Sequence, residues 1–221
     1  MSMTATTLIA HVRVEIGEAT ASFWTDAQLI EYVSRAAQDF SVDTGILVAP
    51  PVQASSVANS GLYSYPTSCP GPHSIIRVFY DGKELQPTTQ DALIGNGNKP
   101  HSDSGTPTHY YTAIYAGVKY LGLCPIPGSA VTNGIVIYFW KIADIMDAGA
   151  DVCEIPDEYY RALVYRASMF AFGPEGEKSK QAYYNDLYTQ EVIRAQDYVN
   201  AQIVASLKDK DSRNTSSRTY F

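Results

Sequence analysis

Cysteine is scarce in this sequence, whose 221 residues include three, at Cys69, Cys124 and Cys153. An odd number at wide spacing matches neither a disulfide framework nor a zinc site, because both need paired or clustered cysteines. The four histidines add no metal-ligand spacing, either among themselves or with the cysteines. We therefore predict no metal site, and we expect synthesis in a reducing compartment such as a cytoplasm.

Long apolar runs and a basic charge balance are also missing. No segment approaches the roughly 20 apolar residues of a membrane-spanning helix, so we expect no membrane partner. Arg13 and Glu15 interrupt the short apolar stretch near the start, and no basic cluster precedes it, so we expect no signal peptide. The formal net charge is −7, whereas a protein that grips nucleic acid has a basic surface. Tight non-specific DNA binding is not expected, although DNA could pass nearby without being held.

Patterns that carry catalysis or cofactor binding are incomplete. The segment 173–180, GPEGEKSK, has the wrong glycine spacing for a phosphate-binding loop, and its Glu177 would repel phosphate. The segment 95–100, GNGNKP, has a proline where a dinucleotide-binding loop needs its third glycine. No serine lies in a nucleophile-elbow pattern. We predict no catalytic, cofactor-binding or metal-ligating residues, and no enzymatic activity.

Tyrosine, in contrast, is abundant, with 17 residues. An apolar ring with a polar tip suits a surface that becomes buried only on assembly. β-Sheets also favour tyrosine, so composition leaves both explanations open. The question is sharpest for the segment 105–140, which is dense in tyrosine and almost uncharged.

Proline divides the chain into regions of different structure. All 12 prolines lie between Pro50 and Pro174, and residues 1–49 and 175–221 contain none. Proline breaks helix interiors but is tolerated in turns and at strand edges. The two ends of the chain can therefore be helical, whereas the middle favours strands and turns.

Apolar periodicity and capping signals predict about four helices at the two ends. The first spans about 4–16. The second begins after Thr25, which forms a capping box with Gln28, and Trp24 before the cap is expected to pack on Leu29 as a hydrophobic staple. The third opens with Pro156 at its first position and ends at Gly173. The fourth runs over about 175–207, which is long for a chain of this size.

The middle of the chain reads as strands. The segment 74–85, SIIRVFYDGKEL, predicts a strand, an Asp-Gly turn and a second strand. Further strands are predicted near 110–114, 118–123 and 135–141, and a single helical turn near 88–97. The sequence therefore predicts an α+β fold, mainly a helical bundle with an inserted β-rich region. Its predicted parts are the N-terminal helices 1–55, the insert 56–154, the C-terminal helices 155–207 and a flexible, extended tail 208–221.

The order of these elements, together with three short phrases, resembles the head-to-tail adaptor (connector) proteins of tailed bacteriophages. The second helix opens with an aromatic–Thr–Asp motif. A Gly-x-Pro motif precedes two tyrosines, and the next strand ends in a Leu-x-Pro-x-Pro motif. The third helix opens with Ile-Pro and two acidic residues. The segments that match are FWTDAQLIEYV (23–33), GTPTHYY (105–111), LCPIP (123–127) and IPDEY (155–159). The loop 95–104 has no counterpart in the family pattern.

This resemblance implies a structural virion protein at the neck of the phage, made in the host bacterial cytoplasm. Such proteins form a ring, typically of twelve copies, that docks under the portal, extends the DNA channel and offers the tail an attachment surface. Its implied partners are further copies of the chain, the portal protein, downstream neck or tail proteins, and viral DNA that passes without sequence-specific binding.

Contact residues are predicted at two places. A polar, locally basic tail that ends in two aromatic residues is expected to order on the portal, unless it stays solvated and unused. Candidates for contacts in the ring or with the tail are exposed tyrosines of the insert and of the long helix. The portal-binding candidates are Lys208, Arg213, Arg218, Tyr220 and Phe221, and the ring or tail candidates are Tyr110, Tyr111, Tyr115 and Tyr188.

Two other functions stay open at this point. Aromatic residues of the insert could form a platform that binds carbohydrate, as in a receptor-binding tail protein. A cell-wall hydrolase carried in the virion is a further alternative. The candidate platform residues are Tyr110, Tyr111, Tyr115, Tyr120, Tyr138 and Trp140.

Overall fold

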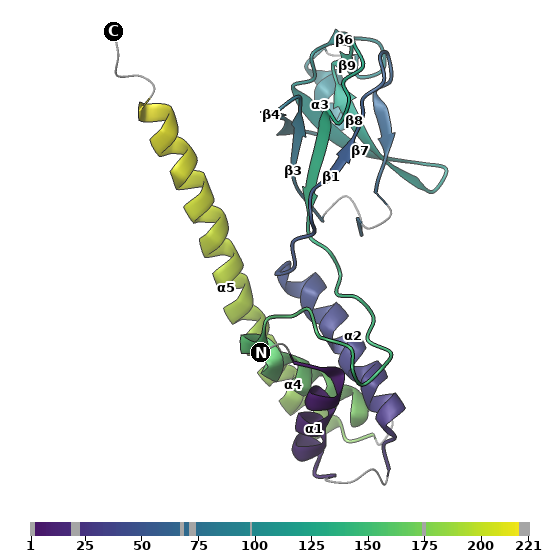
Figure 1. Cartoon of the computed structure of the whole chain (residues 1–221), viewed down its shortest axis with the longest axis vertical. Helices are drawn as coiled ribbons and strands as arrows, with labels where there is room; N and C mark the ends of the chain where they lie inside the picture. Colours follow the sequence, from purple (N-terminus) through teal and green to yellow (C-terminus); the bar gives the residue numbers. More distant parts are fainter. Residues whose placement is uncertain are drawn as a thin grey trace. The chain divides into compact units, whose positions relative to one another are not determined.

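The computed structural model describes residues 3–18, 23–66, 69–70, 74–97, 99–173 and 176–216, with side chains described as far as Gln202. The chain divides into a helical unit, residues 1–47 with 142–221, and a β unit, residues 48–141 (Figure 1). The predicted insert, 56–154, overlaps the β unit but begins and ends later in the chain. The α+β class is confirmed, but "mainly a helical bundle" overstates the helix content, since 41% of the chain is helix and 23% is strand.

Local signals set the ends of the first two helices. α1 (Ala5–Ile16) ends at Gly17, whose left-handed backbone, with φ of 77°, favours a residue without a Cβ. α2 (Asp26–Thr44) begins at the predicted capping box, in which the side chains of Thr25 and Gln28 each accept the backbone N–H of the other. Such a box satisfies two N–H groups that the first turn of a helix leaves without partners.

The remaining helices of this unit differ slightly from the prediction. A 3-10 turn, η2 (Asp157–Tyr159), leads into α4 (Tyr160–Ala171), and Pro156 precedes the turn as its N-cap instead of occupying the first helical position. The reason is that Pro156 has a ψ of 137°, which is an extended conformation. α5 spans Lys178–Ser216.

α5 continues well beyond the predicted end of the fourth helix. Lys208 and Arg213, which the prediction placed in an extended tail, belong to its helical backbone. The segment that follows residue 176 contains neither glycine nor proline, so no residue interrupts the helix there. Arg218, Tyr220 and Phe221 lie outside the described residues.

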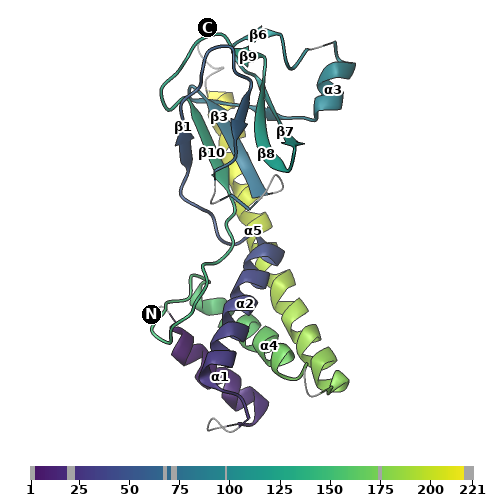
Figure 2. The ribbon, with the colours of Figure 1, turned by 90° about the vertical axis from the view of Figure 1, so that its right-hand side faces the viewer.

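The core of the helical unit forms around α4, which contacts α1, α2 and α5 (Figure 2). Each helix contributes apolar residues at helical spacing, so one stripe of each faces the shared interior. The core includes Leu8, Val12, Leu29, Val33, Phe40, Leu163, Val164, Tyr188 and Ala195.

The segment 142–155 closes one side of the helical unit as a strap without regular structure. The backbone N–H groups of Ala143 and Met146 donate to the hydroxyls of Ser41 and Ser34 of α2, at 3.0 Å each. Cys153 N–H donates to the carbonyl of Met3 at 2.9 Å. These bonds give buried backbone groups partners that a helix or sheet would otherwise supply.

Two four-stranded sheets form the β unit. The first has the order β1-β10-β3-β4, and the second has the order β2-β8-β7-β5. The first consists of β1 (Val52–Ala54), β10 (Ile135–Phe139), β3 (Ile75–Tyr80) and β4 (Lys83–Glu84). The second consists of β2 (Leu62–Ser64), β8 (Val118–Cys124), β7 (His109–Tyr115) and β5 (Gln86–Pro87). A short parallel pair, β6 (Ser104–Gly105) with β9 (Ile126–Pro127), completes the strands that the structure describes.

The predicted Asp-Gly turn between β3 and β4 is confirmed, with φ of 47° at Asp81 and 74° at Gly82. Two positive φ angles suit the twist of a two-residue hairpin. The inner faces of the two sheets share one core, which includes Val78, Ile135, Ile137, Tyr110, Leu121 and Leu123.

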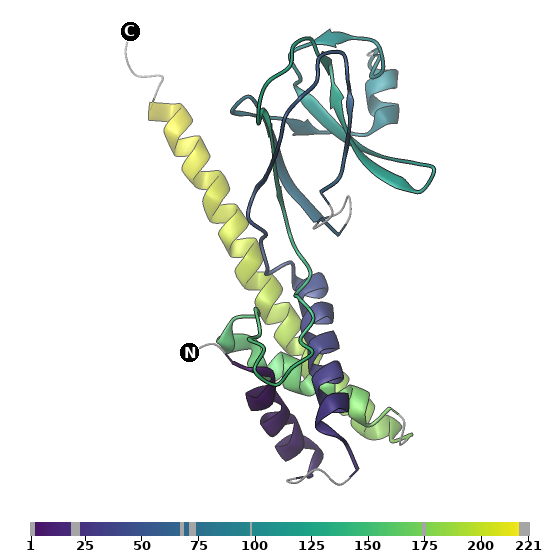
Figure 3. The same cartoon turned by 45° about the vertical axis from the view of Figure 1, so that its right-hand side comes forward.

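A separate small cluster lies on the outer face of the second sheet. There Leu93 of α3 (Gln90–Gly95) packs with Tyr111 and Cys124. Figure 3 shows α3 beside this sheet and the β7–β8 hairpin extending away from it.

Candidate assembly surfaces

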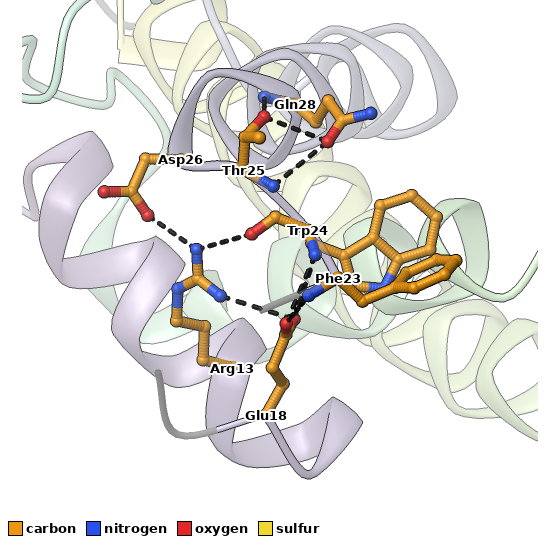
Figure 4. A network of polar contacts seen from close by, with 7 residues as sticks. All are labelled: Arg13, Glu18, Phe23, Trp24, Thr25, Asp26 and Gln28. Atoms are coloured by element: carbon orange, nitrogen blue, oxygen red, sulfur yellow. Dashed lines mark hydrogen bonds and ion pairs between the residues drawn. The ribbon is translucent and has the colours of Figure 1, made fainter. Parts of the chain in front are cut away.

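A buried arginine organises the connection between α1 and α2 (Figure 4). Arg13 is buried, and its Nη2 donates to the backbone carbonyl of Trp24 at 2.9 Å and to Asp26 Oδ1 at 2.6 Å. Its Nη1 lies 3.4 Å from Oε2 of Glu18. Guanidinium is suited to this position because it offers several donors in a fixed plane.

Glu18, which Arg13 holds, in turn binds the backbone of the residues that precede α2. Its Oε1 accepts the backbone N–H groups of Phe23 and of Trp24, the latter at 3.2 Å. The Phe23 ring nevertheless remains 65% exposed, and it meets the Trp24 ring edge-on at 4.8 Å. The network therefore holds the backbone of an aromatic residue whose side chain stays in solvent.

Polar contacts also join α2, α4 and α5. Arg166 donates to Asp39 Oδ2 from Nε at 2.9 Å and from Nη2 at 2.7 Å. The Tyr188 hydroxyl donates to Asp43 Oδ2 at 2.7 Å, and the Arg166 guanidinium lies 4.9 Å from the centre of the Tyr188 ring. These bonds fix the three helices against one another.

Tyr188, predicted as a contact residue, lies in this interior. It is 4% exposed, and burial is the main reason that its pKa is raised above the ordinary value for tyrosine, with the bond to Asp43 as a second reason. Its ring packs near Phe40 in the core. Tyr188 therefore stabilises the subunit, and a charge at this position would disturb the fold before it disturbed a neighbour.

A surface pocket opens between α1, the end of α4 and the start of α5. Three of its lining residues are aromatic: Phe172 stacks on Tyr184 at 5.7 Å with an interplanar angle of 10°, and Tyr183 meets Tyr184 edge-on at 5.3 Å. Burial is the main reason that the pKa of Tyr184 is raised. The pocket has a volume of about 420 Å³ and is lined by Glu15, Ile16, Gly17, Phe172, Ser179, Lys180, Tyr183 and Tyr184.

In the β unit, the structure separates the three predicted tyrosines. Tyr110 points into the core between the sheets, whereas Tyr111 points to the outer face and is fully buried under α3. Burial raises the pKa of Tyr111 to about 12. Neither ring is available to a partner. Adjacent residues of a strand face opposite sides of the sheet, so Tyr110 and Tyr111 could not share one surface.

Tyr115 is the predicted tyrosine that stays accessible, at 40% exposure. It lies at the end of the β7–β8 hairpin, opposite Val118, and the hairpin also exposes Ile114. The hydroxyl of Tyr115 donates to Oε1 of Gln90 at 3.2 Å, and its ring lies 5.9 Å from that of Tyr120. The hairpin tip is thus an apolar projection of the β unit.

The six aromatic residues suggested as a carbohydrate platform do not share one face. Tyr110 and Tyr111 are buried on opposite sides of β7, and Tyr138 of β10 packs edge-on against Phe79 at 5.6 Å. Carbohydrate platforms need exposed rings side by side. Among the described side chains, these residues do not provide them.

Neither a metal-binding cluster nor a membrane-spanning helix occurs among the described residues. Within the described ranges, no group of three or more His, Cys, Asp or Glu side chains could hold a metal ion. No helix in the part of the chain that the structure describes has the length and apolar character needed to cross a membrane.

Sequence reasoning missed Arg13, Glu18 and Phe23 as a group. The capping box and Trp24 marked the start of α2, but nothing in the local pattern indicates that Arg13, from the previous helix, supports that start. Glu18 and Phe23 meet only because the chain turns back between α1 and α2. The one available signal was Phe23 itself, an aromatic residue just outside a predicted helix.

A comparison with curated proteins found no match. A family model described as "SU10 adaptor protein" matches residues 3–215, which is nearly the whole chain. The match spans both units and most of α5, in agreement with the order of elements on which the resemblance rested. The chain therefore belongs to the SU10 adaptor protein family, a family of phage head-to-tail adaptors with a structural role.

Proposed function

We propose that this chain forms a ring of identical subunits, twelve as is typical of head-to-tail adaptors, in the neck of the virion. The ring docks beneath the portal, extends the channel through which DNA passes, and presents an attachment surface for downstream neck or tail proteins. The family match supports the adaptor role, and the ring, the channel and the partners are our extension of it.

The observation that carries the docking part of this proposal is the length of α5. Ala195 is its last buried residue and Val199 its last half-buried one among the described side chains, yet the helix continues to Ser216. The remaining part is about 25 Å long at 1.5 Å per residue. An isolated helix of this length is only marginally stable in water, so a partner surface would account for it.

The composition of this end suits a docking segment. It carries Lys208 and Arg213 on the helix and Arg218, Tyr220 and Phe221 after it, on a chain with a net charge of −7. Basic and aromatic residues can anchor in a partner once they are desolvated. The acidic balance of the whole chain is consistent with a channel that does not hold DNA through its phosphates.

Deletion of residues 208–221 tests this function. We expect the shortened chain to fold normally but to decorate portal rings at an occupancy at least about tenfold lower, because it loses the anchoring residues. Electron microscopy of the full-length and shortened chains mixed with the portal of the same phage measures both occupancy and ring formation. Equal occupancy of the two chains would contradict the docking role, and the absence of a ring with the full-length chain would contradict the adaptor ring.

A further inference from the structure

The second sheet of the β unit has one edge along β7 that no strand of the described chain covers. β7 pairs with β8 over its whole length, but β5 pairs with it only at His109 and Tyr110. The last bond on that side joins the backbone N–H of Thr88 to the carbonyl of Tyr110, at 2.9 Å. The part of β7 from Thr112 to Tyr115 therefore lies at a free edge of the sheet.

Alternation along β7 shows which backbone groups face this edge. In an antiparallel pair, residues that bond to the partner strand alternate with residues whose N–H and C=O groups point away from it. Because the carbonyl of Tyr110 points away from β8, the backbone groups of Thr112 and Ile114 do the same. Both residues are exposed, so these groups face water. We call Thr112 and Ile114 the β7 edge.

The opposite edge of the same sheet is formed by β2. The carbonyl of Gly61 accepts an N–H of β8 at 2.8 Å, and the N–H of Tyr65 donates to a carbonyl of β8 at 3.3 Å. Leu62 and Ser64 lie at the alternate positions, so their backbone groups point away from β8. Ser64 is exposed, and the carbonyl of Leu62 accepts a weak contact from the Ser60 hydroxyl at 3.5 Å. We call Leu62 and Ser64 the β2 edge.

Neither edge carries the features that usually keep free strand edges apart, which are charged side chains, prolines or bulges. Residues 44–76 contain no Asp, Glu, Lys or Arg, and residues 104–140 contain only Lys119. The ammonium group of Lys119 donates to the carbonyl of Pro70 at 2.7 Å, so it is held against its own chain. The hairpin beside the β7 edge (Figure 3) also exposes apolar side chains. Few charges and many aromatic residues are typical of the core of an interface.

We propose that the β7 edge of one copy pairs with the β2 edge of the next copy, so that the second sheets of neighbouring subunits join. Addition of a strand to a free sheet edge is a common mode of recognition, in which main-chain hydrogen bonds supply the affinity. This inference rests on the proposed ring function, and it names the strands that hold neighbouring subunits together.

The position of the two edges is the reason that a second copy is the partner. They lie on opposite sides of β8 in one sheet, so each copy offers one edge to the neighbour before it and one to the neighbour after it. Such a head-to-tail contact repeats from copy to copy and closes into a ring when the rotation allows it. β2 and β7 are both antiparallel to β8, and therefore parallel to each other. A neighbour related by a small rotation keeps this direction, so the joined edges form a parallel pair.

Hydrogen exchange followed by mass spectrometry tests the pairing directly. The full-length chain is compared as a dilute monomer and as a ring bound to the portal of the same phage. We expect amide exchange in peptides that cover the β7 edge and the β2 edge to slow about tenfold or more in the ring, because their N–H groups become hydrogen-bonded. β10, which is paired with β1 and β3 within the subunit, is the internal control and should be unchanged.

Substitutions at each edge give a second readout. Proline lacks the N–H group but is tolerated at an edge where that group faces water. We therefore expect Thr112→Pro and Ser64→Pro to fold but to occupy portal rings at least about tenfold less than the wild type. Thr112→Val and Ser64→Thr keep the N–H group and are the matched controls. Circular dichroism shows whether each variant is folded, and Ile114→Lys or Ser64→Lys, which place a charge at the edge, replace a proline variant that is not.

The outcomes separate the contact from the function. Portal rings that do not bind the wild-type chain would contradict the adaptor function itself. A bound ring in which neither edge gains protection, or folded edge variants with wild-type occupancy, would overturn the edge pairing alone. Protection of only one edge would also overturn it, because that edge would then pair with itself or with the portal.

Discussion

Thr25 and Tyr188 illustrate how much a single residue reveals before the structure is known. The cap formed by Thr25 could be predicted because its partner, Gln28, lies three residues away and a helix start needs such an acceptor. The role of Tyr188 could not be predicted, because its partner Asp43 is distant in sequence and only tertiary packing joins them. The support of Phe23 by Glu18 and Arg13 was missed because it depends on how the chain turns back between α1 and α2, although Glu18 is only five residues away.

Asp151 of the strap gives a pH-dependent prediction at this scale. Its Oδ2 accepts the backbone N–H groups of Asp147 and Ala148 at 2.8 Å each, and these bonds hold the pKa of Asp151 below its ordinary value. Because the pKa of Asp151 is lower in the folded state, its ionised carboxylate stabilises the fold at pH values above the unfolded-state pKa of about 3.9. This contribution is lost as the pH falls through the folded-state pKa.

We therefore expect Asp151→Asn to lower the urea midpoint of unfolding at pH 7 and the difference from wild type to shrink below about pH 3. Urea titrations followed by circular dichroism at the two pH values measure this. Asp197→Asn, at an exposed position of α5, is the matched control. A difference that stays constant with pH would show that the carboxylate charge of Asp151 does not act through these bonds.

At the scale of elements, strands and helices were predictable where the chain signals them locally. Alternating residues and the Asp-Gly turn predicted β3, β7, β8 and β10, and the proline-free ends predicted the helices. The C-terminal end of α5 was placed too early, because polar residues were taken to indicate a flexible tail although Lys and Arg are good helix formers. The covering of β7 by α3 depends on contacts between distant segments and left no local signal.

Gly122 of β8 provides a test at this scale. A Cβ at this position would overlap the ring of Tyr111 on the paired strand β7, so glycine is needed for the close packing beneath α3. We expect Gly122→Ala to destabilise the β unit by about 2–3 kcal/mol through overpacking. Denaturant unfolding followed by near-ultraviolet circular dichroism of the tyrosines measures this change.

Gly105→Ala is the matched control for this substitution. Its Cβ would lie at an ordinary contact distance of 3.6 Å from Pro125, so we expect a change within about 0.5 kcal/mol. If both substitutions changed the free energy of unfolding equally, the Tyr111 ring would have to move aside at little cost. That would contradict the tight packing inferred from its complete burial.

At the scale of the whole molecule, the β unit is inserted in the sequence between the two segments of the helical unit. The prolines predicted an insertion between helical ends, but its boundaries could not be read from sequence. The strap 142–155 contains no helix, and it joins the helical unit through tertiary contacts: hydrogen bonds to Ser34 and Ser41 and buried side chains such as Met146. The surface pocket was equally hidden, because it combines residues from α1, the end of α4 and the start of α5.

The division into units leads to a further prediction. The fragment 48–141 contains both sheets and their shared core, so we expect it to fold alone and to unfold cooperatively. The fragment 1–47 lacks α4 and α5, so we expect it to remain largely unfolded. Thermal unfolding of each fragment by circular dichroism measures this, and a β fragment without a cooperative transition would contradict it.

The split helical unit also has a consequence for how the protein forms during translation. The ribosome completes the whole β unit before α4 and α5 exist, and at 5–20 residues per second the chain from Lys141 to Val199 takes roughly 3–12 seconds to appear. During that interval α1 and α2 can contact each other but lack α4 and α5, against which their apolar stripes also pack. The nascent chain therefore carries a complete β unit after the first segment of an incomplete helical unit. The helical unit is completed only when α5, the last helix synthesised, has appeared.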